Sequence, residues 1–210
     1  MNPQELYQTL KTYKVIPIIA IEQVESALPL ADALLEGGLP VAEITFRTEA
    51  AARVMEKLAK ERPELLIGAG TILTVDQVKK AKDCGATFGV APGFNRKVAE
   101  EAIKQDFPFA PGIMTPSDVE AALDLGLKVL KFFPAEAAGG IDMLKSLVAP
   151  YAHMGIQFIP TGGINLLKAK DYLAIPQVIA VGGTWIARKE EISAGNWATI
   201  RERCLAVRQS

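Results

Sequence analysis

The chain has 210 residues, of which 50% are hydrophobic and 22% are charged, and its formal net charge is −1. This composition supplies a large apolar core and excludes an intrinsically disordered protein, and the balanced charge lacks the basic excess of a nucleic-acid-binding protein. The sequence contains no apolar run long enough for a membrane span and no signal-peptide pattern, so we expect a cytoplasmic protein without a membrane partner. Two cysteines and one histidine argue against a disulfide framework and against a metal site.

Eight short apolar runs rich in β-branched or aromatic residues alternate with longer stretches of helical period. Each run is predicted to be a strand, near Val15–Ile19, Val41–Phe46, Leu65–Ala69, Thr87–Ala91, Phe107–Pro111, Val129–Phe133, Ile156–Pro160 and Val178–Gly182. The chain between successive runs is long enough for one helix and two short loops, which predicts a parallel sheet with crossover helices.

Capping residues and glycines mark the expected helix boundaries. The candidate N-caps are Thr48, Thr74, Thr115 and Asn165, and the candidate stops are Gly37, Gly38, Gly85, Gly126 and Gly155. Pro29 lies in an otherwise helical stretch, where it predicts a kink or a later helix start. Residues 1–14 are predicted to form one additional N-terminal helix.

Eight strand–helix repeats without a linker predict one α/β domain over residues 1–210, a (β/α)8 TIM barrel with the additional N-terminal helix. The alternative is a doubly wound open sheet, because periodicity alone does not fix the topology.

Charged residues within the predicted strands are the first functional signal. Glu43 and Arg47 share one face of the second strand, and Lys131 lies late in the sixth strand on the same face as Phe133. Taken singly, Lys131 is also compatible with an outward-facing lysine, and Glu43 and Arg47 with an ion pair at the rim. Three charges near the carboxyl ends of two strands favour an active site, which lies at that end of a TIM barrel.

These three residue types predict a particular chemistry. A lysine among apolar side chains is favoured as the neutral amine, which attacks a ketone to form a Schiff base. A nearby carboxylate such as Glu43 can move protons, and an arginine such as Arg47 offers a planar set of donors to a carboxylate. Together they indicate an aldolase that acts on a 2-keto acid without a cofactor.

Two glycine pairs follow the last two predicted strands, Gly162-Gly163 and Gly182-Gly183. Glycines allow backbone N–H groups to approach an anion, and the loops after the seventh and eighth strands commonly form a phosphate site in this fold. The pairs therefore predict a phosphorylated ligand.

Six strings of residues, in order along nearly the whole chain, closely resemble the bacterial 2-keto-3-deoxy-6-phosphogluconate (KDPG) aldolase family. They are Glu43–Thr48, Gly68–Thr71, Pro111–Pro116, Lys131–Glu136, Pro160–Ile164 and Gly182–Trp185. The resemblance implies a barrel fold, a homotrimer, no metal or other cofactor, and a lyase of the Entner–Doudoroff pathway. It also implies cleavage of KDPG to pyruvate and glyceraldehyde 3-phosphate, and of 4-hydroxy-2-oxoglutarate to pyruvate and glyoxylate.

The resemblance further implies roles for individual residues. Lys131 matches the Schiff-base lysine and Glu43 the acid/base glutamate. The residues that match substrate contacts are Arg47 and Thr71 for the pyruvate carboxylate, Pro92, Phe133 and Thr161 for the walls, and Gly162, Gly163, Gly183 and Thr184 for the phosphate.

Two alternatives stay open. One is a related aldolase for another C4 epimer or for an unphosphorylated keto acid. The other is a non-catalytic barrel that binds sugar phosphates, which would keep both glycine pairs but would not need Lys131 or Glu43.

Overall fold

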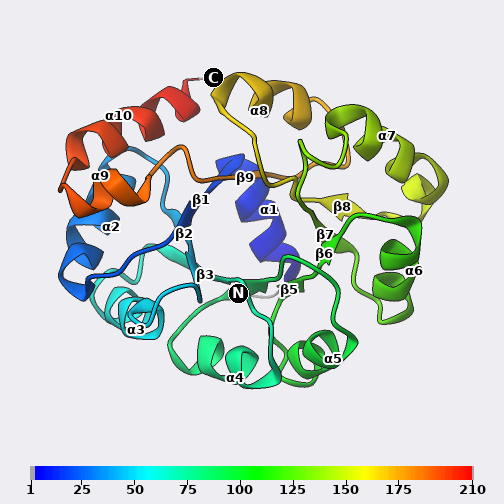
Figure 1. The fold of residues 1–210 in the computed structure, drawn as a ribbon, viewed down its shortest axis with the longest axis horizontal. Coiled ribbons are helices and arrows are strands. Elements are labelled where there is room, and N and C mark those ends of the chain that lie inside the picture. Colours follow the sequence, from blue (N-terminus) through cyan, green and yellow to red (C-terminus); the bar gives the residue numbers. More distant parts are fainter. Residues whose placement is uncertain (1–2, 210) are drawn as a thin grey trace.

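The structure, a computed structural model, describes residues 3–209. Short strands lie in the middle of the molecule and helices surround them in a ring (Figure 1). The strands are β1 (Val15–Ile19), β2 (Val41–Thr45), β3 (Leu66–Gly70), β4 (Phe88–Val90), β5 (Phe109–Ala110), β6 (Gly112–Ile113), β7 (Val129–Phe132), β8 (Gln157–Phe158) and β9 (Val181–Gly183).

The helices largely alternate with the strands, as the periodicity predicts. They are α1 (Pro3–Tyr13), α2 (Ala27–Glu36), α3 (Ala51–Glu61), α4 (Val75–Asp83), α5 (Arg96–Lys104), α6 (Pro116–Asp124), α7 (Gly140–Tyr151), α8 (Leu166–Leu173), α9 (Lys189–Ser193) and α10 (Trp197–Arg208), with 3₁₀ turns η1 (Val24–Ser26) and η2 (Ala152–Met154). The exceptions to the alternation are α1 before β1, β6 directly after β5, and two helices after β9.

The strands form two parallel sheets. One curled sheet has six strands in the order β5-β4-β3-β2-β1-β9, and the other has three in the order β6-β7-β8. Pro111, which has no N–H to donate, separates β5 from β6, so the predicted strand Phe107–Pro111 is shorter than expected and a second segment follows it. The fold is therefore α/β with parallel strands.

Backbone hydrogen bonds link the two sheets at both junctions. At one junction Lys131 N on β7 donates to the carbonyl of Pro111 over 2.8 Å. At the other, Gly182 N on β9 donates to the carbonyl of Pro160 over 2.8 Å, and Thr161 forms an isolated bridge with Gly182. The two sheets are therefore hydrogen-bonded to one another at two places.

A continuous apolar cluster fills the space between the sheets and the helices, and its buried members run from Leu6 in α1 to Val207 in α10. Helix α1 lies across the middle of the ring in Figure 1 and buries Leu6 and Leu10. The first and last helices, α1 and α10, therefore share the same core.

Three of the four predicted N-caps are confirmed. The hydroxyls of Thr74 and Thr115 accept hydrogen bonds from backbone N–H groups in the first turns of α4 and α6, and the Asn165 side chain does so for α8. Helix α2 begins at Ala27, which places Pro29 in its first turn, where a helix does not need the N–H. Of the two outcomes predicted from Pro29, a kink or a later helix start, the structure shows a helix that starts two residues before the proline.

Two local predictions are wrong. Thr48 does not cap α3, which begins at Ala51, because its hydroxyl instead donates to the carbonyl of Ile21 over 2.7 Å. The last strand, predicted from Val178, is continuous only from Val181; Val178 forms an isolated parallel bridge with Phe158, while its own N–H donates in a turn to Ile175.

Among residues 3–209, no helix combines the length and the apolar character needed to cross a membrane.

Cys84 and Cys204 are both free thiols. Cys204 is buried, and burial raises the pKa of its thiol to about 12. Cys84 is only half-buried.

Candidate active site

A cavity of about 470 Å³ opens at the carboxyl ends of the strands. This is the end at which (β/α) folds hold their active sites, because the loops that follow the strands converge there. Every residue that the sequence places in the site lines this cavity, namely Glu43, Arg47, Thr71, Pro92, Lys131, Phe133, Thr161, Gly162, Gly163, Gly183 and Thr184.

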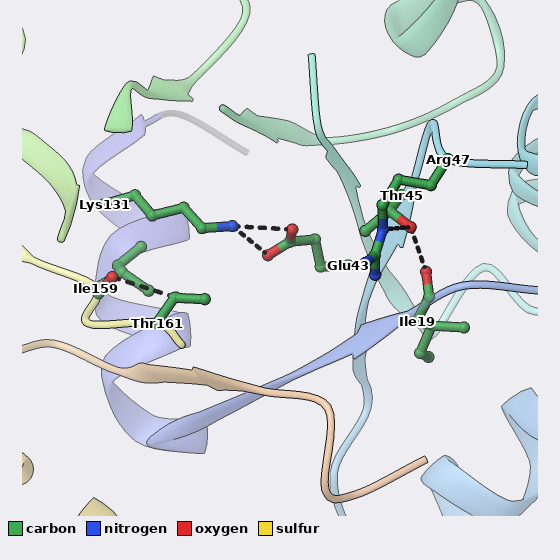
Figure 2. Close-up of polar contacts among 7 residues, drawn as sticks. All are labelled: Ile19, Glu43, Thr45, Arg47, Lys131, Ile159 and Thr161. Atoms are coloured by element: carbon green, nitrogen blue, oxygen red, sulfur yellow. Dashed lines mark hydrogen bonds and ion pairs between the residues drawn. The ribbon is translucent and has the colours of Figure 1, made fainter. Parts of the chain in front are cut away.

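A buried ion pair lies at the centre of the cavity. Figure 2 shows Lys131 of β7 and Glu43 of β2 pointing toward one another, with the Lys131 Nζ 3.1 Å from Glu43 Oε1 and 3.4 Å from Oε2. The two residues are only 5% and 3% exposed. Burying two charges is costly unless they are paired, so a buried pair that lines a cavity is a candidate for chemistry.

Gly70 makes room for the Glu43 carboxylate. It lies on β3 opposite Thr45 of β2, and a Cβ atom at this position would stand 2.2 Å from Glu43 Oε1. Any larger residue would therefore displace the carboxylate from the Lys131 amine. Gly68 on the same strand has a different reason, because a Cβ there would stand 2.2 Å from the Phe88 ring.

A relay of hydrogen bonds orients Arg47 beside the pair. Its Nε donates to Thr45 Oγ1 over 3.1 Å, and the Thr45 hydroxyl in turn donates to the carbonyl of Ile19 over 2.9 Å (Figure 2). Within the described part of the chain, the two terminal nitrogens of Arg47 have no protein acceptor. They are therefore available to an anionic group in the cavity.

Thr71 adopts a backbone conformation that side-chain-bearing residues rarely take, with φ at +58°. A threonine held in this region costs about 1–3 kcal/mol, and such strain is concentrated at functional sites.

An aromatic ring lies next to the Lys131 amine. The Phe133 ring centroid is 5.9 Å from the Lys131 Nζ. The ring gives the amine an aromatic neighbour.

The other end of the cavity is built from glycine turns. Gly162 and Gly163 both have positive φ, at +106° and +77°, so their N–H groups face directions that other residues could not sustain. Neither N–H donates to an acceptor among residues 3–209. A Cβ at Gly183 would stand 1.5 Å from the Trp185 ring, so glycine is required there too. This end presents backbone donors suited to an anion.

The sequence assigned Gly182 only as a member of the second glycine pair, and it gave no site role to six other lining residues: Ile18, Thr45, Ile164, Asn165, Trp185 and Arg188. Thr45 was visible on the face that Glu43 shares, whereas Arg188 lies in a loop without a recognisable signal. Three basic side chains, Arg47, Lys131 and Arg188, line the cavity, whereas Glu43 is the single lining carboxylate. This excess of positive charge makes the cavity attractive to anions.

In the described chain, no three His, Cys, Asp or Glu side chains are grouped so that they could hold a metal ion.

These features define a class of protein: an α/β enzyme with a lysine–glutamate centre at the carboxyl ends of parallel strands. The family model described as KDPG and KHG aldolase matches residues 6–203. This chain belongs to that family.

Individual relatives agree with the family. The 2-dehydro-3-deoxy-phosphogluconate aldolase of Haemophilus influenzae is 47% identical over 94% of this chain and 92% of its own length. The KHG/KDPG aldolase of Escherichia coli K12 is 39% identical over 91% of this chain and 89% of its own length.

The crystal structure of the KDPG aldolase of Legionella pneumophila is similar to this structure, with a TM-score of 0.91. The two chains are 41% identical, and the similarity covers 96% of this chain and 97% of the other. That structure holds pyruvate captured at low pH as a covalent carbinolamine intermediate.

Proposed function

We propose that this protein is a class I aldolase that cleaves KDPG to pyruvate and glyceraldehyde 3-phosphate, and also cleaves 4-hydroxy-2-oxoglutarate to pyruvate and glyoxylate. The observation that carries this proposal is the buried contact of 3.1 Å between the Lys131 amine and the Glu43 carboxylate. The names of the relatives and the carbinolamine of the Legionella enzyme support it.

In this mechanism, Lys131 is the nucleophile. Its neutral amine attacks the C2 ketone, and the resulting carbinolamine loses water to give a protonated imine. Glu43 lies close enough to accept the proton that the lysine must lose and to return protons as water departs. The imine then serves as an electron sink, so no metal is needed.

Carbon–carbon cleavage uses the same carboxylate. Glu43, directly or through a water molecule, takes the proton from the C4 hydroxyl as the C3–C4 bond breaks and its electrons move into the imine. The aldehyde product leaves, and Glu43 returns the proton to C3 of the enamine. Hydrolysis of the pyruvate imine regenerates the free Lys131 amine.

Substrate binding divides between the two ends of the cavity. The terminal nitrogens of Arg47 and the hydroxyl of Thr71 would bind the pyruvate carboxylate. Pro92, Phe133 and Thr161 would form the walls around the carbon chain. A further set would hold the phosphate: Gly162, Gly163, Gly183 and Thr184.

Trapping of the imine tests this proposal. Pyruvate with borohydride should inactivate the protein irreversibly, and peptide mapping should find the reduced adduct on Lys131 and on no other lysine. Kinetics on KDPG, its C4 epimer and 4-hydroxy-2-oxoglutarate then identify the preferred substrate. Phosphate-ester binding without an adduct or turnover would instead support the alternative of a non-catalytic binding protein.

We also infer that the two sheets form one closed eight-stranded barrel, in which β5 and β6 are halves of one strand and α1 is an additional helix. The hydrogen bonds across both junctions and the apolar cluster that includes α1 and α10 support this, and they also support the proposal that residues 1–210 are one domain.

The remaining expectations concern assembly and location. We propose a homotrimer, supported by exposed apolar side chains such as Leu73 and Met114 that an interface would cover. A monomer mass from light scattering at micromolar concentration would contradict the homotrimer.

The two free cysteines support a reducing compartment, for which we propose the cytoplasm.

A further inference from the structure

Glu136 ends the string Lys131–Glu136, yet its carboxylate does not line the cavity. It contacts α8 instead, where it accepts a hydrogen bond from the Tyr172 hydroxyl over 2.7 Å and forms an ion pair with the Lys168 Nζ. The loop after β7 is thereby tied to the helix that follows the Gly162-Gly163 turn.

The buried hydroxyl of Tyr172 needs the Glu136 carboxylate as its hydrogen-bond partner. The residue is 0% exposed, and a buried hydroxyl without a partner costs about 1–3 kcal/mol. Burial, together with the hydrogen bond to Glu136, raises the pKa of the Tyr172 hydroxyl, so it remains a donor. The hydrogen bond from Lys168 lowers the pKa of Glu136, so the carboxylate remains an acceptor.

The same residue also fixes the glycine turn. Glu136 N donates to the carbonyl of Gly162 over 3.1 Å, and Ala135 N donates to the carbonyl of Thr161 over 2.8 Å. A Cβ at Gly163 would stand 2.7 Å from the Cβ of Glu136, so the two residues pack closely. The backbone, the side-chain stem and the carboxylate of Glu136 therefore all hold this turn against α8.

We infer that Glu136 is a positioning residue for the phosphate end of the substrate: with Tyr172 and Lys168 it fixes the Gly162-Gly163 turn in the conformation that presents its N–H groups to the phosphate. This inference rests on the proposed function. The string Lys131–Glu136 then serves both ends of the substrate: Lys131 at its start forms the imine, and Glu136 at its end holds the glycine turn that binds the phosphate.

A second tyrosine–glutamate pair provides a matched control. The Tyr151 hydroxyl donates to Glu120 Oε1 over 2.9 Å and joins α7 to α6 on the outside of the molecule. Neither residue lines the cavity or contacts the glycine turns. The hydrogen-bonding groups are the same, a tyrosine hydroxyl and a glutamate carboxylate, but this pair is more exposed, whereas Glu136 is also paired with Lys168, so the control measures loss of the hydrogen bond away from the glycine turn.

The test compares kcat and KM of four variants, Glu136→Gln, Tyr172→Phe, Glu120→Gln and Tyr151→Phe, on KDPG and on 4-hydroxy-2-oxoglutarate, which has no phosphate. We expect Glu136→Gln and Tyr172→Phe to lower the ratio of kcat/KM for KDPG to that for 4-hydroxy-2-oxoglutarate by roughly three- to thirtyfold, since part of the free energy of a charged hydrogen bond is lost. The Glu120 and Tyr151 variants should leave the ratio unchanged. Pyruvate trapping on Lys131 should remain at the wild-type rate in all four.

Equal losses on both substrates, or slowed trapping, would overturn the inference, because Glu136 would then support the fold or the imine chemistry. An unchanged ratio in both site variants would also overturn it. If Glu136→Gln does not fold, Tyr172→Phe decides, since it removes one hydroxyl and keeps the buried ring. A wild-type protein that neither traps pyruvate nor cleaves KDPG would refute the proposed function itself, whatever the variants do.

Discussion

The two ends of the cavity are built in different ways. The Lys131–Glu43 pair lies on strands β7 and β2, and hydrogen bonds to neighbouring strands hold both backbones. The phosphate end lies in turns, where glycines supply the conformation and side chains such as Glu136 supply the support. Strand residues are positioned by the sheet itself, whereas loop residues need contacts of their own, so changes at the two ends should have different consequences.

The largest effect should come from Lys131→Arg. The guanidinium keeps a positive charge beside Glu43 but stays protonated and cannot condense with a ketone, so both trapping and turnover should be abolished. Mass spectrometry after pyruvate and borohydride treatment measures this. Lys128→Arg is the control, because Lys128 is exposed and does not line the cavity. An adduct that persists in Lys131→Arg would assign the imine to another lysine.

Glu43→Gln should separate proton transfer from imine formation. Loss of a positioned general acid–base should lower cleavage by roughly 10²–10⁴-fold, while trapping on Lys131 slows but continues. Exchange of the pyruvate methyl protons, followed by NMR, should fall in parallel with cleavage because both need a base at the same carbon. Full exchange in a variant that no longer cleaves would contradict a shared role for Glu43.

Gly70→Ala tests the position of the carboxylate without changing its chemistry. The new Cβ would stand 2.2 Å from Glu43 Oε1, and a displacement of about 1 Å from a reacting group can cost roughly 10²-fold in rate. Gly93→Ala is the matched control, because a Cβ there meets nothing within 4 Å. Wild-type kcat in Gly70→Ala, with the ion pair still in place, would show that the cavity tolerates the methyl group.

At the phosphate end, Gly163→Asp should act mainly on the phosphorylated substrate. The acidic side chain repels the phosphate and crowds Glu136, so KM for KDPG should rise roughly tenfold or more, with a much smaller effect on 4-hydroxy-2-oxoglutarate. Gly163→Ala separates the steric part from the charge. Equal losses of kcat/KM on both substrates would mean that the phosphate binds elsewhere.

The smallest effect concerns a further contact near this end. Arg203 binds the Glu191 carboxylate and also donates to the carbonyl of Trp185 over 2.8 Å, which holds the loop after β9. We expect Glu191→Gln to lower the free energy of unfolding at pH 7 by about 1 kcal/mol. Glu36→Gln, which breaks an exposed pair with Arg201, should change it by much less, as chemical denaturation will show.

The pH dependence of this last effect has a definite sign. The hydrogen bond from Arg203 lowers the pKa of Glu191 in the folded state. The stabilisation is therefore complete above the pKa of an unfolded glutamate and is lost as the pH falls through the lowered folded value. The difference between wild type and Glu191→Gln should shrink below about pH 4. A difference that stays constant with pH would mean that the carboxylate charge is not involved.

Local sequence determined much of this protein. Strand and helix alternation, the caps Thr74 and Thr115 and the start of α2 near Pro29 all depend on neighbours within a few residues, so they could be predicted from the sequence. The side-chain alternation of β2 and β7 also placed Glu43 and Lys131 on functional faces. Thr48 failed as a cap because its hydroxyl binds a carbonyl 27 residues away, which no local pattern can indicate.

Only the tertiary structure decided which groups meet. Glu43 and Lys131 are separated by 88 residues, and their contact requires two sheets to face one another across a common interior. Gly70 and Glu136 both lie in strings that resemble the family, but the sequence gives neither a role, because the Glu43 carboxylate beside Gly70 and the Tyr172 hydroxyl beside Glu136 come from distant elements. Hydrophobic periodicity specifies which face a residue occupies, but the partner it contacts depends on how distant elements pack.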